Sequence, residues 1–248
     1  MRLAIVTAFH GRPEISEVFH LGIRRLQARF DVRLFAAVTE GHVSNAVLCE
    51  LTDTTYVWHD NVDLGAKHNA AMALARAWEP DAVMVLGSDD LVSGDYAMWV
   101  LEQVAAGAEY LYPGAITLYS PAMGMALKLE GPIQHHRTFF GAGRVYSRSL
   151  MERMDWKPWS EVGQCKGLDN DSHFRVSFLG GDPPAKVLED GLPHVLDIKG
   201  GGNITDMTLL RGRGTEITLD EAMWFLGVQE RAGIDALMKQ EANPAVRP

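Results

Sequence analysis

Apolar and polar positions alternate along the first half of the chain in a way that predicts strands and helices in turn. Short apolar or β-branched runs are typical of buried strands, and apolar residues three or four positions apart are typical of amphipathic helices. The predicted strands are Leu3–Val6, Val32–Val38, Thr54–Trp58 and Ala82–Leu86, and the predicted helices are Pro13–Phe30, Ser44–Leu51 and Gly65–Trp78. Because strands that alternate with helices form parallel sheets with right-handed crossovers, this half predicts an α/β fold.

The pattern changes after Gly107. Short strand-like pieces separated by Gly and Pro predict antiparallel additions or long loops, at Glu109–Tyr112, Ala115–Tyr119 and Ala126–Leu129. Later helices are predicted at Leu150–Met154, Asp169–Leu179 and Leu219–Lys239, whereas Asp182–Asn203 is rich in Pro and Gly and is expected to be irregular. The second half therefore adds to the sheet of the first half rather than repeating it.

Composition narrows the class of protein. The 248 residues are 47% apolar and 22% charged, as in a soluble globular domain, and the net charge of −9 disfavours a broad electrostatic surface for nucleic acid or anionic membrane. Cys49 and Cys165 are too few for a disulfide framework or a zinc cluster. The sequence shows neither a secretory leader nor about 20 consecutive apolar residues, so we predict a cytoplasmic protein, in the host cytoplasm if it is viral.

Two adjacent aspartates, Asp89 and Asp90, follow the apolar strand Ala82–Leu86. The carboxyl edge of an open α/β sheet is where ligands bind, and two hard oxygen donors there suit a divalent cation that neutralises phosphate. The alternative is that Ser88 and the two aspartates end the strand and cap a helix that begins near Gly94, since Ser and Asp are common capping residues.

Two common glycine-rich motifs for nucleotide binding are missing from the sequence. The chain has no G-x-G-x-x-G after its first strand and no G-x-x-x-x-G-K-[ST], so dinucleotide oxidoreductases and P-loop enzymes lose their main support. A run of three glycines, Gly200 to Gly202, follows Lys199. Glycine amides beside an ammonium group suit an anion such as a diphosphate, and the alternative is a flexible turn.

Five segments, in order between Arg2 and Thr205, resemble the motifs of GT-A glycosyltransferases, close to family 2. These segments are RLAIVTAFHGRP, NVDLGAKHNAAMALA, VMVLGSDD, GAGRVYSRSLMERM and GLDNDSHFR. The resemblance implies a mostly parallel, Rossmann-like sheet flanked by helices, with an irregular C-terminal half and a C-terminal helix. It also implies one domain with a nucleotide-binding half over residues 1–107, an acceptor and catalytic half over 108–205, and a helical extension over 206–248.

The same resemblance implies a site for a nucleoside-diphosphate sugar, with UDP among the candidate nucleotides. Asp89 and His194 are the expected ligands of Mn²⁺ or Mg²⁺, and Asp169, with Asp171 beside it, is the expected catalytic base. The residues expected to contact the donor are Thr7, Ala8, Phe9, Arg12, Lys67, His68, Asn69, Ser88, Asp90, Gly141 and Lys199. For Lys67 and His68 the alternative is a solvated position at the start of a helix.

The chain departs from the family pattern at several of these positions. Gly87 replaces the first aspartate of Asp-x-Asp, and Leu168 replaces the glutamate of the acidic motif. Thr39 and Glu40 stand where the family often has aspartate at the end of the second strand. A single carboxylate can still hold the metal because the diphosphate supplies further oxygens.

The roles that the resemblance implies for these residues predict a metal-dependent transfer of sugar to an acceptor hydroxyl. The metal stabilises the charge on the leaving phosphate, and Asp169 removes the hydroxyl proton, which predicts inversion. In a retaining enzyme Asp169 would instead bind the acceptor. His135 and His136 are alternative donor or acceptor contacts, and Trp156 and Trp159 are either sugar-stacking or core residues.

Two other functions stay open. A sugar nucleotidyltransferase shares a related sheet, but TAFHGRPE is poor in the glycines and basic residues that hold a triphosphate. An inactive nucleotide-sugar-binding protein would explain Gly87 and Leu168. The acceptor is a glycan, a small molecule, a protein or a modified base of viral DNA, and the oligomeric state is open.

Overall fold

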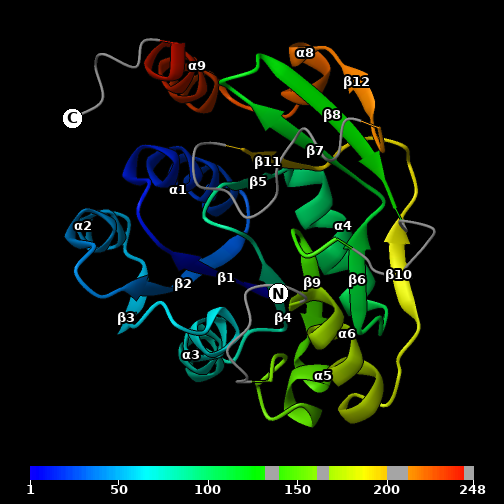
Figure 1. The fold of residues 1–248 in the computed structure, drawn as a ribbon. Helices are drawn as coiled ribbons and strands as arrows, with labels where there is room; N and C mark the ends of the chain where they lie inside the picture. Colours follow the sequence, from blue (N-terminus) through cyan, green and yellow to red (C-terminus); the bar gives the residue numbers. More distant parts are fainter. Residues whose placement is uncertain (132–139, 161–167, 200–211, 243–248) are drawn as a thin grey trace.

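The computed structural model describes residues 1–131, 140–160, 168–199 and 212–242, and it contains two β-sheets (Figure 1). The larger, seven-stranded sheet has the order β10-β6-β9-β4-β1-β2-β3. Its strands are β1 (Arg2–Phe9), β2 (Asp31–Thr39), β3 (Thr55–His59), β4 (Ala82–Val85), β6 (Tyr110–Pro113), β9 (Arg144–Ser147) and β10 (Ala185–Leu188). Neighbouring strands are parallel except around β9, which is antiparallel to both β4 and β6. The carboxyl ends of β1, β2 and β4 therefore lie at one edge of this sheet.

Helices cover both faces of the larger sheet (Figure 1). They are α1 (Pro13–Gln27), α2 (Val43–Leu51), α3 (Leu64–Ala77), α4 (Gly94–Ala105), α5 (Arg148–Arg153) and α6 (Leu168–Leu179). Because successive side chains of a strand point to opposite faces, Leu3 and Ile5 of β1 join a core cluster with α1, α2 and α4. Ala4 and Val6 join the cluster that contains α3, α5 and α6. This burial on both faces explains the nearly continuous apolar runs of β1 and β4.

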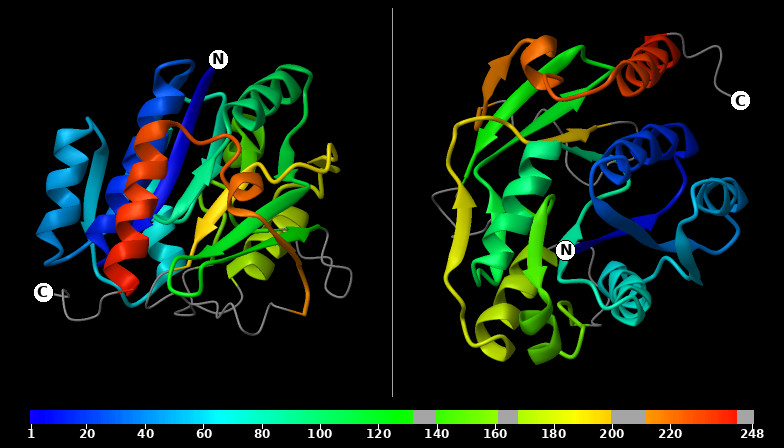
Figure 2. Two further views of the ribbon diagram at one scale, coloured as in Figure 1. Left: turned by 90° about the horizontal axis from the view of Figure 1, so that it is seen from above. Right: turned by 180° about the vertical axis from the view of Figure 1, so that it is seen from behind.

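The smaller sheet has the order β12-β8-β7-β11-β5. Its strands are β5 (Asp90–Val92), β7 (Ala115–Ser120), β8 (Met125–Glu130), β11 (Val195–Ile198) and β12 (Thr215–Ile217), and helices α8 (Leu219–Ala222) and α9 (Val228–Ala242) follow. Helix α9 packs beside α1 (Figure 2). A partly buried ion pair joins the two helices, with 2.6 Å between Arg25 Nε and Glu230 Oε1. No helix within the described ranges is long and apolar enough to cross a membrane.

The predicted alternation of strands and helices in the first half is confirmed, and so are the three short strands after Gly107. Two expectations are wrong. Asp182–Asn203 is not wholly irregular, because it contains β10 and β11, which form by pairing with β6 and β7. Leu219–Lys239 is not one helix, because α8 ends at Ala222 and α9 begins only at Val228. The division of the chain at residues 107 and 205 stays a prediction.

Candidate functional site

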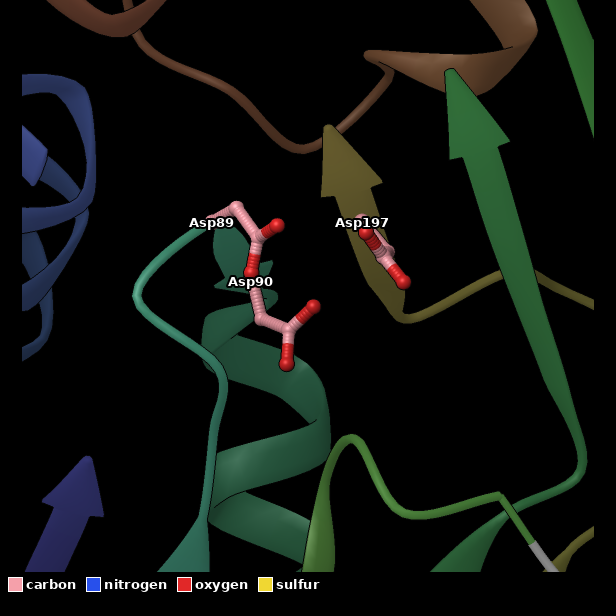
Figure 3. Close-up of side chains that lie close together, drawn as sticks. All are labelled: Asp89, Asp90 and Asp197. Atoms are coloured by element: carbon pink, nitrogen blue, oxygen red, sulfur yellow. The ribbon is translucent and has the colours of Figure 1, made fainter. Parts of the chain in front are cut away.

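Three carboxylates meet where the two sheets join. The chain leaves β4 at Val85, turns, and enters β5 at Asp90, which is the direct cross-strand partner of Asp197 on β11. Asp89 lies in the turn, and one ligand oxygen from each of Asp89, Asp90 and Asp197 lies within 4.8 Å of the other two. Figure 3 shows the two neighbouring aspartates and Asp197 on β11 turned toward one another. We call these three residues the acidic trio.

Gly87 shapes the turn that carries two members of the trio. Its amide donates a hydrogen bond to Asp90 Oδ2, and its carbonyl accepts one from the Asp90 amide at 3.1 Å. A Cβ atom at this position would lie 2.7 Å from Asp89 Oδ1 and 3.0 Å from Asp90 Oδ2. The residue that departs from the Asp-x-Asp pattern therefore leaves room for the carboxylates of Asp89 and Asp90, while Asp197 adds a third from another strand.

Two cations already contact the acidic trio. Arg12 Nη1 lies 2.9 Å from Asp89 Oδ2, and its Nη2 donates to Ser88 Oγ at 3.5 Å. Lys199 Nζ pairs with Asp197 Oδ2. Arg12 adopts a left-handed conformation (φ 49°, ψ 54°) directly before Pro13, where most residues are extended. Such a conformation costs about 1 to 3 kcal/mol in a non-glycine residue and is commonest at functional sites.

Burial and repulsion between carboxylates raise the pKa values of Asp90 and Asp197. Burial, followed by the carboxylates of Asp197 and Asp89, raises the pKa of Asp90 well above its usual value. Burial also raises the pKa of Asp197 to about 6, although Lys199 opposes this shift. Burial alone would lower the pKa of Lys199, but the carboxylates of Asp197 and Asp89 produce a net increase.

The donor set of the trio suits a divalent cation. Asp197 is only 9% exposed, and its buried Oδ1 has no hydrogen-bond partner among the described residues. A buried carboxylate oxygen without a partner is costly, and an ion would satisfy it. Because all three ligands are hard carboxylate oxygens, Mg²⁺ or Mn²⁺ fits the site better than a thiophilic metal does.

The buried side chain of Lys67 is the centre of a second polar cluster, at the ends of β1 and β2. Its side chain is fully buried, and Nζ donates hydrogen bonds to Phe9 O at 2.6 Å, to Thr39 Oγ1 and to Asn61 Oδ1 at 3.3 Å. Burial lowers the pKa of Lys67 to about 8. The alternative of a solvated helix start is therefore wrong for Lys67. We call these four residues the lysine cluster.

The alternative of a solvated helix start is also wrong for His68, the next residue of α3. It is 8% exposed, its Nδ1 lies 2.9 Å from Leu64 O, and its ring lies 4.9 Å from that of Trp159. Trp156 is 2% exposed and Trp159 is 4% exposed, so both indoles belong to the core.

Two predicted site residues make hydrogen bonds to Trp159 and Ser160. Asn69 Nδ2 donates to Trp159 O at 2.8 Å, and both oxygens of Asp171 accept from Ser160, one from the amide and one from the hydroxyl, each at 2.7 Å. Both carboxylate oxygens of Asp171 therefore have partners within the protein. Asp169 lies in the first turn of α6, and its side chain lies outside the described residues. Its role as base stays a prediction.

His194 does not join the acidic trio. It is 1% exposed, with Nδ1 2.7 Å from Ser93 Oγ and Nε2 2.7 Å from Asp190 Oδ2, so both ring nitrogens already have partners. Asp197, three residues later, lies where we expected the late ligand. One feature of the sequence indicates that Asp197 is a site residue, because it is a single acidic residue within the apolar strand Val195–Ile198.

The remaining predicted positions lie at the same edge of the sheet or outside the described residues. Thr7 and Phe9 are fully buried at the end of β1, and the Phe9 ring packs against Phe19, so only its backbone faces the lysine cluster. Ala8 is partly buried between them, and Gly141 precedes β9. The residues His135, His136 and Gly200 to Gly202 lie outside the described part of the chain.

No protein-family model and no curated protein matches the sequence of this chain. Solved structures do match. Staphylococcus aureus TarS 1-349, a glycosyltransferase, aligns with a TM-score of 0.52 and 12% identity over 80% of this chain and 60% of that one. The crystal structure of that fragment in complex with UDP gives 0.53 and 13% over 81% and 61%. Its complex with UDP-GlcNAc gives 0.52 and 12% over 100% and 68%.

This chain spans about 60% of the length of the first TarS fragment, and the low identity means that the likeness concerns the fold. The fold class predicted from the sequence is confirmed, whereas the closer assignment to family 2 stays a prediction. The chain therefore has a GT-A-like glycosyltransferase fold, with the acidic trio at the carboxyl end of its fourth strand.

Proposed function

We propose that this protein is a metal-dependent glycosyltransferase that takes its sugar from a nucleoside-diphosphate sugar. The observation that supports this most is the acidic trio, which lies at the carboxyl edge of the central sheet in a GT-A-like fold. The trio alone would suit many metal enzymes, and the fold alone would suit an inactive protein. Their coincidence favours a transferase.

Asp89, Asp90 and Asp197 would hold the divalent cation. When bound, this cation stabilises the negative charge that develops on the leaving diphosphate. Arg12 and Lys199 bring two further positive charges to the same place, and a guanidinium binds phosphate oxygens in a bidentate manner. The lysine cluster holds the ends of β1 and β2 together and forms a rigid base for the nucleotide.

Asp169 would take the proton of the acceptor hydroxyl as the oxygen attacks the anomeric carbon, which makes the transfer inverting. The contacts between Asp171 and Ser160 support this role indirectly, because they fix the first turn of α6. The complexes of TarS with UDP and UDP-GlcNAc make a UDP-hexose the first donor to test.

A donor screen tests the proposal. UDP-, GDP-, TDP- and CMP-sugars are tested with Mn²⁺ for thermal stabilisation and slow donor hydrolysis, first with the wild-type protein. Asp89→Ala should abolish Mn²⁺-dependent stabilisation by the donor. Asp169→Asn should bind the donor normally but lower turnover at least about 100-fold, the usual contribution of a general base. Asp220→Asn is the matched control, because its side chain is 95% exposed.

The same screen separates the competing functions. Release of pyrophosphate from a nucleoside triphosphate would identify a sugar nucleotidyltransferase. Stabilisation by a nucleoside diphosphate with Mn²⁺, without hydrolysis or transfer to any glycan, peptide, small molecule or hydroxymethylated DNA, would identify a binding protein. Absence of any nucleotide effect would refute the proposal.

A further inference from the structure

We propose that Arg12 is a built-in counter-cation of the acidic trio, which must leave Asp89 before a divalent cation binds and thereby makes metal binding depend on the diphosphate. The inference rests on the proposed function for the identity of the anion. Its first part, competition between Arg12 and the metal, concerns only residues of this chain.

The geometry of Arg12 supports this role. The residue is the N-cap of α1, yet its side chain makes no capping hydrogen bond to the helix. Its guanidinium instead reaches Asp89 and Ser88 from a left-handed backbone position that lies directly before a proline. Non-glycine residues rarely adopt this conformation. In the loop between β1 and α1, Arg12 therefore combines an unfavourable backbone conformation with an ion pair to Asp89, a candidate metal ligand.

The charges around the trio explain why a metal would compete with Arg12. Three carboxylates stand within 4.8 Å of one another, and two side-chain cations contact them. A divalent ion bound to Asp89 while Arg12 stayed in place would lie on the same carboxylate as the guanidinium, which is 2.9 Å from Oδ2. The two positive charges would repel each other at this short range, so binding at Asp89 is unfavourable until Arg12 moves away.

Arg12 is the cation that can move. Lys199 occupies Oδ2 of Asp197 and leaves the buried Oδ1 of the same carboxylate available, so it can stay while Asp197 binds an ion. Arg12 lies against Oδ2 of Asp89, and its side chain is 27% exposed, whereas that of Lys199 is 12% exposed. A turn of the Arg12 side chain toward solvent frees an Asp89 oxygen without changing β5 or β11.

A diphosphate gives the displaced guanidinium a new partner. Phosphate oxygens accept two parallel hydrogen bonds from arginine, so a bound diphosphate would draw Arg12 away from Asp89 and free that carboxylate for the metal. Such coupling is reciprocal, because each ligand must strengthen the binding of the other by the same factor. The structure thus predicts weak binding of the metal alone and strong binding of the metal with the nucleotide.

The test measures Mn²⁺ binding without nucleotide by titration calorimetry. Arg12→Gln should bind Mn²⁺ at least about fivefold more tightly than the wild type, the lower end of ordinary coupling energies. Arg24→Gln is the matched control and should bind like the wild type. It makes the same charge change at an exposed site on α1, about 18 Å along the helix. Arg12→Gly removes the charge and suits the left-handed backbone, so it should fold and bind Mn²⁺ as tightly as Arg12→Gln.

A second titration measures UDP and GDP binding at saturating Mn²⁺. Arg12→Gln should weaken the nucleotide that binds the wild type at least about fivefold, so one substitution changes the two affinities in opposite directions. Equal or weaker Mn²⁺ binding by both Arg12 variants would overturn the inference. If the wild type binds neither nucleotide, UDP- and GDP-sugars are excluded as donors, and the proposed function fails if no nucleotide of the donor screen binds. The titration with Mn²⁺ alone decides the role of Arg12 in either case.

Discussion

The lysine cluster and the acidic trio lie at the same edge of the larger sheet. They differ in whether all polar atoms of the charged side chains have partners within the described residues. Lys67 uses three donor positions on three oxygen atoms of Phe9, Thr39 and Asn61. In the acidic trio, by contrast, Asp90 faces Asp197 directly, although like charges in cross-strand positions repel each other. One oxygen of Asp197 also has no partner within the described residues.

This difference distinguishes a charged side chain that supports the fold from charged side chains that are available to bind a ligand. A buried cation whose hydrogen bonds are all made inside the chain holds its partners in place, although burial itself opposes the charge, and removing the side chain leaves the partners short of a donor. A group of like charges with unused oxygens does not stabilise the fold by itself and gains most from a ligand of opposite charge. We therefore expect mutations in the two clusters to have different consequences.

The largest expected effect is the loss of stability in Lys67→Met. The substitution removes the Nζ donor to Phe9 O and Asn61 Oδ1 and leaves the Thr39 hydroxyl, whose single proton can serve only one of these two oxygens. The free energy of unfolding should therefore fall by about 2 to 4 kcal/mol. Urea denaturation at pH 7 measures this change. Lys186→Met removes a lysine from an exposed position on β10 and should stay within about 0.5 kcal/mol of the wild type. Equal stability of the two variants would contradict a structural role for Lys67.

The second effect is a pair of opposite pH dependences. Between about pH 8, the lowered pKa of folded Lys67, and its usual value of 10.5, the unfolded chain binds more protons. The free energy of unfolding should therefore rise with pH in this window, by up to about 3 kcal/mol. Between 3.8 and the raised pKa of about 6, folded Asp197 binds more protons, so stability should fall as the pH rises.

Denaturation at a series of pH values measures both slopes, and each has its own variant. The contribution between pH 8 and 10.5 should be absent from Lys67→Met, and the contribution between pH 3.8 and 6 should be absent from Asp197→Asn. If a variant kept the slope of the wild type, the assignment of that slope to the substituted residue would be refuted.

The smallest effect concerns Gly87→Ala. The added methyl group would lie 2.7 Å from Asp89 Oδ1, so this carboxylate must turn away, at a cost to metal binding rather than to the core. We expect about tenfold weaker Mn²⁺ binding, equivalent to about 1.4 kcal/mol, with stability unchanged within about 1 kcal/mol. Gly212→Ala is the control, since a Cβ there meets no atom within 4 Å. Unchanged Mn²⁺ affinity would show that Gly87 does not shape the site.

Sequence analysis could predict those parts of the site that depend on a single element. The end of a buried strand was enough to predict Ser88 and Asp89, and the start of a helix was enough to predict Lys67 and Asn69. The partners of these residues were harder to predict. Nothing local pairs Lys67 with Phe9 and Thr39, because these residues come together only when β1, β2 and α3 pack against one another.

His194 and Asp197 illustrate the same limit within one short segment. A lone histidine at a suitable interval was the reasonable candidate ligand, but the fold places its ring between Ser93 and Asp190. Asp197 became a candidate only through the antiparallel pairing of β11 with β5. A strand of four residues with a central acid carries too little periodicity to reveal such pairing.

The sequence by itself determined the alternation of strands and helices, the parallel arrangement of the first half and the position of Asp89, because apolar periodicity and strand ends are local properties of the chain. Only the tertiary structure decided that Asp197 completes the acidic trio and that Arg12 forms an ion pair with Asp89. It also decided that Gly87 leaves room for the carboxylates of its neighbours in the turn. The contacts of Asp197 and Arg12 join segments far apart in the sequence and depend on how the strands pair, whereas the contact of Gly87 depends on the geometry of one turn. None of them follows from an apolar pattern within one segment.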